Sequence, residues 1–173
     1  KLKILANSAL NFSINRIIEI FGAAIFISGI FLLASLITFS PEDPNFIFPN
    51  DSDINNILGF HGSFTADIFF QTFGIISLLI PFSFIISSIN IIWGKKILLI
   101  IETFFYTILY SLLGSLFFSF FYPTSFKLFI NGNGGFVGKY LESTFLNSLV
   151  NINSQIFYYI LSLLILILFL MSI

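Results

Sequence analysis

The residues whose types and spacing are closest to known chemistry form a glycine-rich stretch, NGNGGFVGKY, at positions 131–140. It contains Gly-Lys, the pair near the end of a phosphate-binding P-loop. A P-loop requires Gly-x-x-x-x-Gly-Lys-Ser/Thr, because its glycines let backbone N–H groups wrap the phosphates and its hydroxyl binds magnesium. Here Asn133 stands at the first glycine position and Tyr140 at the hydroxyl position. A dinucleotide fingerprint also fails, because Val137 replaces its third glycine.

We therefore expect no nucleotide at this stretch. The glycines predict a tight turn, and the following FVGKYLESTFLNSLV predicts a short amphipathic helix near the headgroups. Its apolar residues recur at steps of three and four. They are Phe136, Val137, Tyr140, Leu141, Phe145 and Leu149.

The only histidine, His61, lies six residues before Asp67, which raises the question of a metal or proton-relay site. A zinc site would need carboxylate or water partners throughout, which is uncommon, because the chain has no cysteine and no second histidine. No Gly-x-Ser-x-Gly nucleophile motif occurs either. We expect an exposed loop histidine, and no catalytic, cofactor-binding or metal-ligating residue in this segment.

Composition indicates where these residues must lie. Of 173 residues, 57% are hydrophobic and only 9% are charged, whereas a soluble domain carries about 25% charged residues. The net charge of −1 provides no basic face for nucleic acid. The absence of cysteine excludes disulfides, thiolate metal sites and cysteine nucleophiles. The low charge predicts an integral membrane protein.

Four apolar runs are long enough to cross a hydrocarbon core of ~30 Å, which takes ~20 helical residues. They extend over about 17–39, 66–93, 97–121 and 153–173. The runs are continuously apolar without two-residue alternation, which favours helices over barrel strands. The first run is longer than the ~7–15 residues of a signal-peptide core and lacks a cleavage motif. The sequence predicts an all-α fold, a single four-helix membrane bundle over residues 1–173.

Lysine and arginine predict the orientation of the bundle. They precede the first run or occupy the turn between the second and third: Lys1, Lys3, Arg16, Lys95 and Lys96. The connection between the first two runs has four acidic residues and no basic one. We therefore expect both termini in the cytoplasm and two external loops, at 40–65 and 122–152.

Besides Asp67, near the start of the second span, two acidic residues lie within the predicted spans. Glu102 is a functional candidate by default, as an intramembrane carboxylate, but Lys95 and Lys96 are only one to two turns away, which favours contact with a lysine or with interfacial water. Glu19 follows Arg16 by three residues, which predicts a pair on one helix face.

Small hydroxyl residues recur at every fourth position of the third span: Thr103, Thr107, Ser111, Ser115 and Ser119. With Gly114 beside them they form a shallow surface that allows close helix packing in lipid. A water-lined path is the alternative interpretation. The partners expected on the first span are Gly22, Ala23, Ala24, Ser28 and Gly29.

Local signals predict how the first two spans are bounded. Pro41 and Pro44 bracket two acids, and neither proline position can continue a helix, so the first span ends before them. Thr65 is the expected N-cap of the second span, with Asp67 in its first turn.

The order of these segments resembles the N-terminal membrane domain of the FtsK/SpoIIIE family of bacterial DNA translocases. That family has a Ser-Pro-x-Asp-Pro-Ser-Trp-like segment after its first helix and Gly-x-x-Gly-Ala-x-x-Ala-Asp-x-x-Phe-x-x-Phe-Gly at its second. It also has a proline within the second helix and Gly-Gly-x-x-Gly before the fourth. The matching positions are Ser40, Pro41, Asp43, Pro44, Gly59, Gly62, Ala66, Asp67, Phe70, Phe73, Gly74, Pro81, Gly134, Gly135 and Gly138. Asn45-Phe46 and Ser63 depart from the pattern, where Ser-Trp and Ala are common.

The resemblance implies a non-enzymatic segment that anchors, oligomerises and locates a DNA translocase at the division septum of the bacterial inner membrane. It implies a hexamer, the lipid bilayer and other division-site membrane proteins as partners. ATP, magnesium and double-stranded DNA would belong to a cytoplasmic motor outside these residues. Because the chain begins with lysine and its last run has no basic flank, we expect the whole protein to continue into that motor.

Two other functions remain open. A small four-helix transporter or channel subunit would need inverted repeats, broken helices or paired charges at the midplane, at which only Pro81, Asn90 and Glu102 hint. A membrane-embedded enzyme would use His61 and Asp67, but no further groups converge with them in the sequence.

Overall fold

The computed structural model describes residues 2–44, 53–124, 131–144 and 153–173, and in these ranges the regular structure is entirely helical. The elements in chain order are α1 (Leu2–Ile37), α2 (Gly59–Phe73), the 3-10 helix η1 (Gly74–Leu79), α3 (Ile80–Gly94), α4 (Ile97–Phe121), α5 (Gly135–Glu142) and α7 (Ser154–Ser172).

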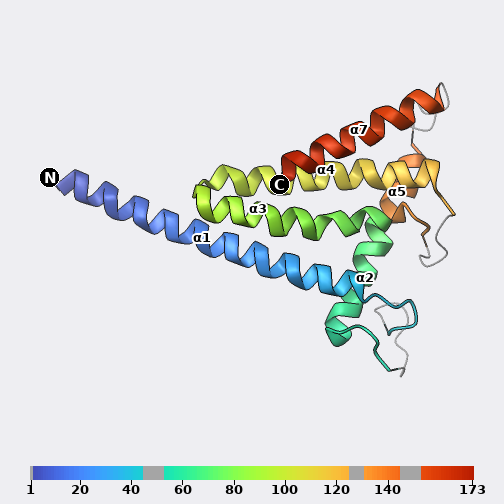
Figure 1. The fold of residues 1–173 in the computed structure, drawn as a ribbon, viewed down its shortest axis with the longest axis horizontal. Helices are drawn as coiled ribbons and strands as arrows, with labels where there is room; N and C mark the ends of the chain where they lie inside the picture. The colour runs from blue at the N-terminus through green and yellow to red at the C-terminus, as the bar shows by residue number, and fades with distance from the viewer. Residues whose placement is uncertain (1, 45–52, 125–130, 145–152) are drawn as a thin grey trace.

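Four helical segments of the described chain are long and apolar enough to cross a membrane. Figure 1 shows α1, α3, α4 and α7 running in alternating directions beside one another. We call the end that holds Lys95 and Lys96 the turn end, and the opposite end, where α1 finishes and α7 begins, the loop end. The N-terminal end of α1 and the C-terminal end of α7 are both directed toward the turn end. The predicted all-α bundle of four membrane helices is confirmed.

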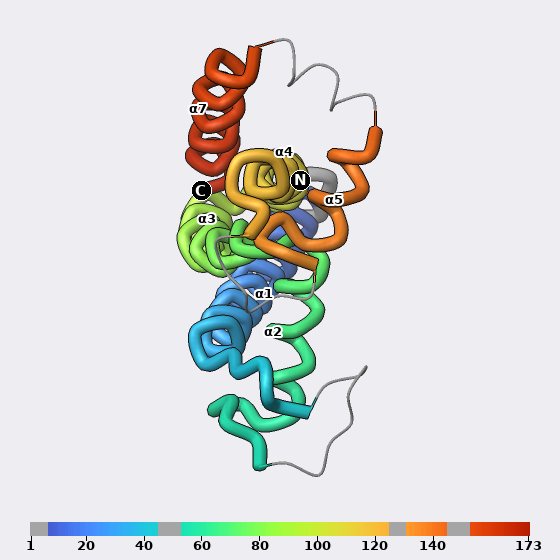
Figure 2. The backbone as a smooth tube through the Cα atoms, turned by 90° about the vertical axis from the view of Figure 1, so that its right-hand side faces the viewer, coloured from blue at the N-terminus to red at the C-terminus, as the bar shows by residue number. Residues whose placement is uncertain are grey.

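The second apolar run is not one helix, as the sequence suggested, because it breaks at Gly74. This residue has φ 70°, a left-handed conformation that favours glycine. Before the break, α2 crosses the direction of the bundle at the loop end, as Figures 1 and 2 both show. After it, η1 and α3 run along the bundle for about 34 Å, enough to cross a core of ~30 Å.

The predicted N-cap at Thr65 is therefore wrong. The N-cap position is Leu58, seven residues earlier, and the helix begins at Gly59, whose φ of 63° marks the bend into α2. Thr65 lies inside α2, where its hydroxyl donates to the carbonyl of His61 at 2.7 Å. Asp67 accordingly lies well beyond the first turn. A glycine-rich start resembles a loop in sequence, and this is why the first turns of α2 were assigned to one.

The first helix is longer than its predicted span. It has 36 residues, which corresponds to about 54 Å at ~1.5 Å per residue, and its first half projects past the turn end in Figure 1. Its glycines pack on α3: a Cβ on Gly22 would lie 2.7 Å from Ile92 Cγ1, and one on Gly29 would lie 2.9 Å from Ile85 Cγ1. The expected pairing of α1 with the hydroxyl face of the third span is thus wrong.

The interior divides into two apolar clusters. The larger one, near the loop end, contains Leu32, Leu36, Ala66, Phe70, Ile76, Ile80 and Tyr110. The smaller one, nearer the turn end, contains Ile18, Ile25 and Ile91. Outside them the helices carry exposed Ile, Leu and Phe side chains in large numbers. Where a helix crosses the membrane, lipid covers such side chains and their exposure costs nothing.

Candidate functional site

Asp43, in the SPEDP segment, is the centre of the connection between α1 and α2. Its side chain is 3% exposed. The carboxylate accepts hydrogen bonds from Asn55 N at 2.8 Å, Asn55 Nδ2 at 3.0 Å and Asn56 N at 2.9 Å. These donors replace the water that a buried carboxylate loses. The acid between the two prolines therefore holds the chain that leads into α2.

Asn56 continues this connection back to α1. Its side-chain amide donates to the carbonyls of Ser35 at 2.9 Å and Thr38 at 3.2 Å, which α1 leaves without helical partners. Its Oδ1 accepts from Leu58 N at 3.1 Å. A Cβ on Gly62 would overlap Asn56 Oδ1, so this position requires a glycine.

Ser63 completes the connection by donating to the Pro44 carbonyl at 3.0 Å. We call Asp43, Asn55, Asn56 and Ser63 the α1–α2 clasp. The SPEDP and GFHGS segments are its two halves. Sequence reasoning missed Asn55 and Asn56, although two adjacent asparagines before a glycine at a helix start were the available signal.

The glycine-rich stretch forms a second polar junction, between α2, η1 and α4. Asn133 O accepts from Ile75 N at 2.9 Å, which bridges the break at Gly74. A Cβ on Gly135 would lie 2.5 Å from Thr72 O, and one on Gly134 would lie 2.5 Å from Ser115 O. Backbones in close contact explain why these positions are glycines.

The short helix expected after the glycines is present as α5, Gly135–Glu142. Phe145 and Leu149, which were expected to extend it, lie outside the described residues. Ser115, which contacts the glycines, lies six residues before the end of α4, about 9 Å from it along the axis. The glycine loop therefore re-enters beside α4 rather than resting on its end, and Figure 2 shows α5 alongside α4.

Side chains fix the glycine loop on both sides. Asn131 Nδ2 donates to Gln71 O at 3.3 Å and to Gln71 Oε1 at 3.2 Å. Asn133, 1% exposed, donates to the carbonyl of Tyr122 at 2.5 Å. Ser119 donates to Glu142 and so joins α4 to α5. We call Gln71, Asn131, Asn133, Ser119 and Glu142 the loop junction.

The hydroxyl face of α4 is buried at all five positions, which confirms its interpretation as a packing surface. Around Ser115 and Ser119 its partners are the end of α2, η1 and α5 rather than α1. Ser115 Oγ donates to Phe73 O at 2.9 Å and also to Ser111 O at 2.8 Å. Gly114 faces Ile76 of η1 so closely that a Cβ would overlap that side chain.

A cluster of hydroxyls links three helices at mid-height. Ser83 Oγ of α3 lies 2.9 Å from Tyr110 OH of α4 and 2.7 Å from Ser172 Oγ of α7. On the same face of α4, Thr107 Oγ1 and Ser111 Oγ are buried without a hydrogen-bond partner among the described residues.

His61 and Asp67 are not brought together. They are six residues apart on α2 and hence about 120° apart around its axis. His61 is exposed, as expected, but it lies on the helix and not in a loop. Asp67 is 6% exposed and accepts from Gln71 Nε2 at 3.4 Å. Across the described ranges, no three acidic or histidine side chains gather in a way that could hold a metal ion.

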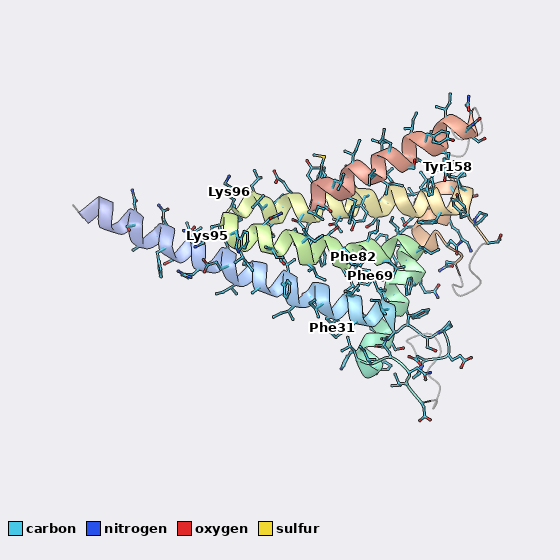
Figure 3. All side chains as sticks on the ribbon, in the orientation of Figure 1. Phe31, Phe69, Phe82, Lys95, Lys96 and Tyr158 are labelled. Atoms are coloured by element: carbon cyan, nitrogen blue, oxygen red, sulfur yellow. The ribbon has the colours of Figure 1, made fainter. Side chains whose placement is uncertain are left out.

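At the turn end, Glu19 pairs with Arg16, as predicted, and also with Lys95 Nζ at 2.8 Å. The second pair joins α1 to the turn between α3 and α4, where Lys95 ends α3 with a φ of 51° (Figure 3). Lys95 thus pairs with Glu19 of α1 and not with Glu102 of its own hairpin.

Comparison with known proteins agrees with this arrangement. Residues 15–173 match the family described as the 4TM region of DNA translocase FtsK/SpoIIIE. The chain is also 33% identical over 70 residues to a protein named DNA translocase FtsK from Rickettsia bellii (strain RML369-C). That match covers 40% of this chain and 8% of the Rickettsia protein, so the chain corresponds to a small part of its relative. No solved structure matches. The chain belongs to the family formed by the four-helix membrane region of FtsK/SpoIIIE DNA translocases.

Proposed function

We propose that this segment anchors a DNA translocase in the membrane and that it assembles and positions the translocase at the division septum. An anchoring role is supported by the polar loop residues, which form buried structural hydrogen bonds. Asp43, Asn56 and Asn133 are buried in hydrogen bonds that hold the connecting segments to one another and to the ends of helices. Groups that served a reaction would instead converge on a space for a substrate.

The motor belongs to the rest of the protein in this proposal. The relative from Rickettsia bellii is named a DNA translocase and is far longer than the matched part. ATP, magnesium and double-stranded DNA would act in that further part, since the glycine loop here is occupied by the backbones of α2 and α4. The parent protein is accordingly a DNA-translocating ATPase.

The proposed location is the bacterial inner membrane, with the turn end in the cytoplasm. Arg16, Lys95 and Lys96 gather near that end, and cytoplasmic ends of membrane helices carry an excess of such residues. A hexamer and contacts with other division-site membrane proteins follow from the family resemblance.

Replacing this segment in the living cell tests its role. The whole protein, fused to a fluorescent protein, is compared with a version in which residues 1–173 give way to an unrelated four-helix anchor of the same topology. We expect the native version to concentrate at septa and the replaced version to spread evenly over the membrane. Septal concentration of both would assign positioning to another part of the protein.

A channel or transporter subunit is the second candidate, and one observation favours it. Thr107 and Ser111 present buried hydroxyls without partners among the described residues, next to the hydroxyl cluster of Ser83, Tyr110 and Ser172. Proteoliposomes loaded with a proton-sensitive dye would reveal a conducting path. A flux that Thr107→Val and Ser111→Ala abolish would favour this function over an anchor.

A further inference from the structure

Two carboxylates are buried at the loop end, and their surroundings differ. Asp43 is 3% exposed and accepts hydrogen bonds of 2.8, 3.0 and 2.9 Å in the α1–α2 clasp. Asp67, on α2, is 6% exposed, and its one hydrogen bond with a described residue comes from Gln71 Nε2 at 3.4 Å. An ionised carboxylate away from water needs donors that replace its hydration. Asp43 has a full set of such donors, whereas Asp67 has one distant donor.

The neighbours of Asp67 on its own helix do not stabilise a charge. Ala66, beside it, and Phe70, three residues later, belong to the larger apolar cluster of the bundle. Ser63, four residues before it, donates its hydroxyl to the Pro44 carbonyl. Removal from water favours the neutral form of a carboxyl group unless nearby charges or donors compensate. The packing around Asp67 therefore suits a protonated carboxyl group better than an ionised one.

The charged groups on the elements packed against α2 do not pair with Asp67 in the described part of the chain. These elements are α1, α4, α5 and η1. The charges of α1 and α4 lie toward the turn end, away from α2 (Figure 1), and η1 has none: Lys3, Arg16, Glu19 and Glu102. On α5, Glu142 accepts from Ser119, and Lys139 is exposed.

The other titratable groups at the loop end are exposed or bonded elsewhere. Tyr110, in the same apolar cluster, has its hydroxyl 2.9 Å from Ser83 Oγ, and Tyr122 OH lies 3.1 Å from Tyr158 OH. The remaining described groups are exposed to their surroundings: Glu42, Asp53, His61 and Tyr140. Asp67 is therefore the buried carboxyl group of this end whose charge the described residues leave uncompensated.

Gln71 connects Asp67 to the glycine-rich loop. Its Nε2 donates to Asp67, while its Oε1 and its backbone oxygen accept from Asn131 Nδ2 at 3.2 and 3.3 Å. Asn131 begins the loop in which the Asn133 carbonyl accepts from Ile75 N at 2.9 Å and so bridges the break at Gly74. A change in the packing of Asp67 is therefore passed through one side chain to the contact that bridges α2 and η1.

We propose that Asp67 is a pH-sensitive switch: its carboxyl group holds a proton while α2 is packed, and loss of this proton loosens α2 and the glycine-rich loop. Loosening lets water reach the ionised carboxylate, which offsets the contacts that are given up. The proton passes to water, so no further reactant is needed. The loosened state binds fewer protons than the packed state, and the packed arrangement therefore becomes less stable as the pH rises.

Hydrogen–deuterium exchange of the full-length protein in nanodiscs tests the proposal. The variant is Asp67→Asn, which keeps the shape of the side chain but cannot ionise. The variant and the unsubstituted protein are compared at the same pH, so the direct effect of pH on exchange cancels. At about pH 8 we expect exchange in α2 and in residues 131–135 to be about tenfold slower in the variant. At about pH 5 the two proteins should exchange at the same rate.

Matched variants separate the proton from the packing. Asp53→Asn makes the same substitution at an exposed position and should alter exchange at neither pH. Asp43→Asn should speed exchange at the higher pH, because donors surround that carboxylate. Gln71→Leu removes the bond to Asn131, so in its presence Asp67→Asn should slow exchange in α2 but no longer in the glycine-rich loop.

Several outcomes would overturn the proposal. Equal or faster exchange in Asp67→Asn at the higher pH would mean that the charge of Asp67 is compensated in the packed bundle. Slowing of the same size at both pH values would mean that asparagine packs better and that no proton is involved. The unsubstituted protein gives a measurement that depends on no variant. After correction for the direct effect of pH, its α2 must exchange more slowly at the lower pH, or the proposal fails.

Discussion

The loop end and the turn end of this bundle join the same helices by different means. At the loop end, buried polar side chains bond to backbone carbonyls, and glycines allow backbones to touch. At the turn end, a small isoleucine cluster and a partly exposed pair between Glu19 and Lys95 hold α1 to the hairpin of α3 and α4. Buried hydrogen bonds need exact partners, whereas exposed ion pairs contribute little. The packing of the helices at the loop end is therefore fixed by particular residues, whereas the packing at the turn end can shift.

The largest contrast concerns access from the two sides of the membrane. Single cysteines at Ser143, at the loop end, and at Gly94, at the turn end, should react oppositely with a membrane-impermeant thiol reagent in intact cells. We expect labelling at Ser143 and none at Gly94 until the cells are opened. The reverse pattern would invert the proposed orientation of the whole bundle.

Substituting the glycine at the helix break should have the next largest effect. In Gly74→Val, the new Cβ would overlap the Asn133 carbonyl, and valine would be forced into a left-handed conformation. We expect a loss of about 3 kcal/mol or more in the free energy of unfolding, measured by denaturant titration in detergent.

Gly94→Ala is the control for this variant, because the new Cβ there would meet only the end of the Leu99 side chain, at 3.0 Å. It should change stability by no more than about 0.5 kcal/mol. Equal effects at both glycines would contradict the difference between the two ends.

Asp43→Asn tests the α1–α2 clasp. The substitution keeps the shape but turns an acceptor oxygen into an amide that faces the donors of Asn55 and Asn56. We expect a loss of about 1–3 kcal/mol, measured by the same titration. Asp53→Asn, at an exposed position of the same connection, should be nearly neutral, and a neutral Asp43→Asn would mean that the clasp is not needed.

Glu19→Gln should have the smallest effect. It removes both charge pairs at the turn end, which are partly exposed and screened by salt. We expect no measurable change in the unfolding midpoint, but faster amide hydrogen exchange in the first half of α1. Exchange that also rises in α2 or α5 would show that the two ends are coupled.

The features that could be predicted from the sequence are those that depend on residues close together in the chain. Long apolar runs determine how many helices a bilayer accepts, so the four membrane helices were recognisable without a structure. The buried face of Thr103, Thr107 and Ser111 was also recognisable, because its four-residue spacing is local to one helix.

Features that depend on distant partners were not predictable in the same way. The reason for Gly74 is a carbonyl at Asn133, and the reason for Gly62 is an amide at Asn56. Neither contact produces a periodic pattern in the sequence. The break at Gly74 was therefore predicted to be part of one continuous span. The same applies to Lys95, which has Glu102 nearby in sequence but pairs with Glu19, on another helix.

The sparse burial of α7 has a consequence for how the protein is made. Only Leu161 and Ser172 of this helix are buried, whereas the main contacts of α1 with α3 and of the glycine loop with α4 use residues that precede it in the chain. During synthesis, the first three spans and the loop junction can therefore take up their final arrangement before the last helix leaves the ribosome. We therefore expect α7 to dock against helices that are already packed, so its insertion does not determine how the first three spans are arranged.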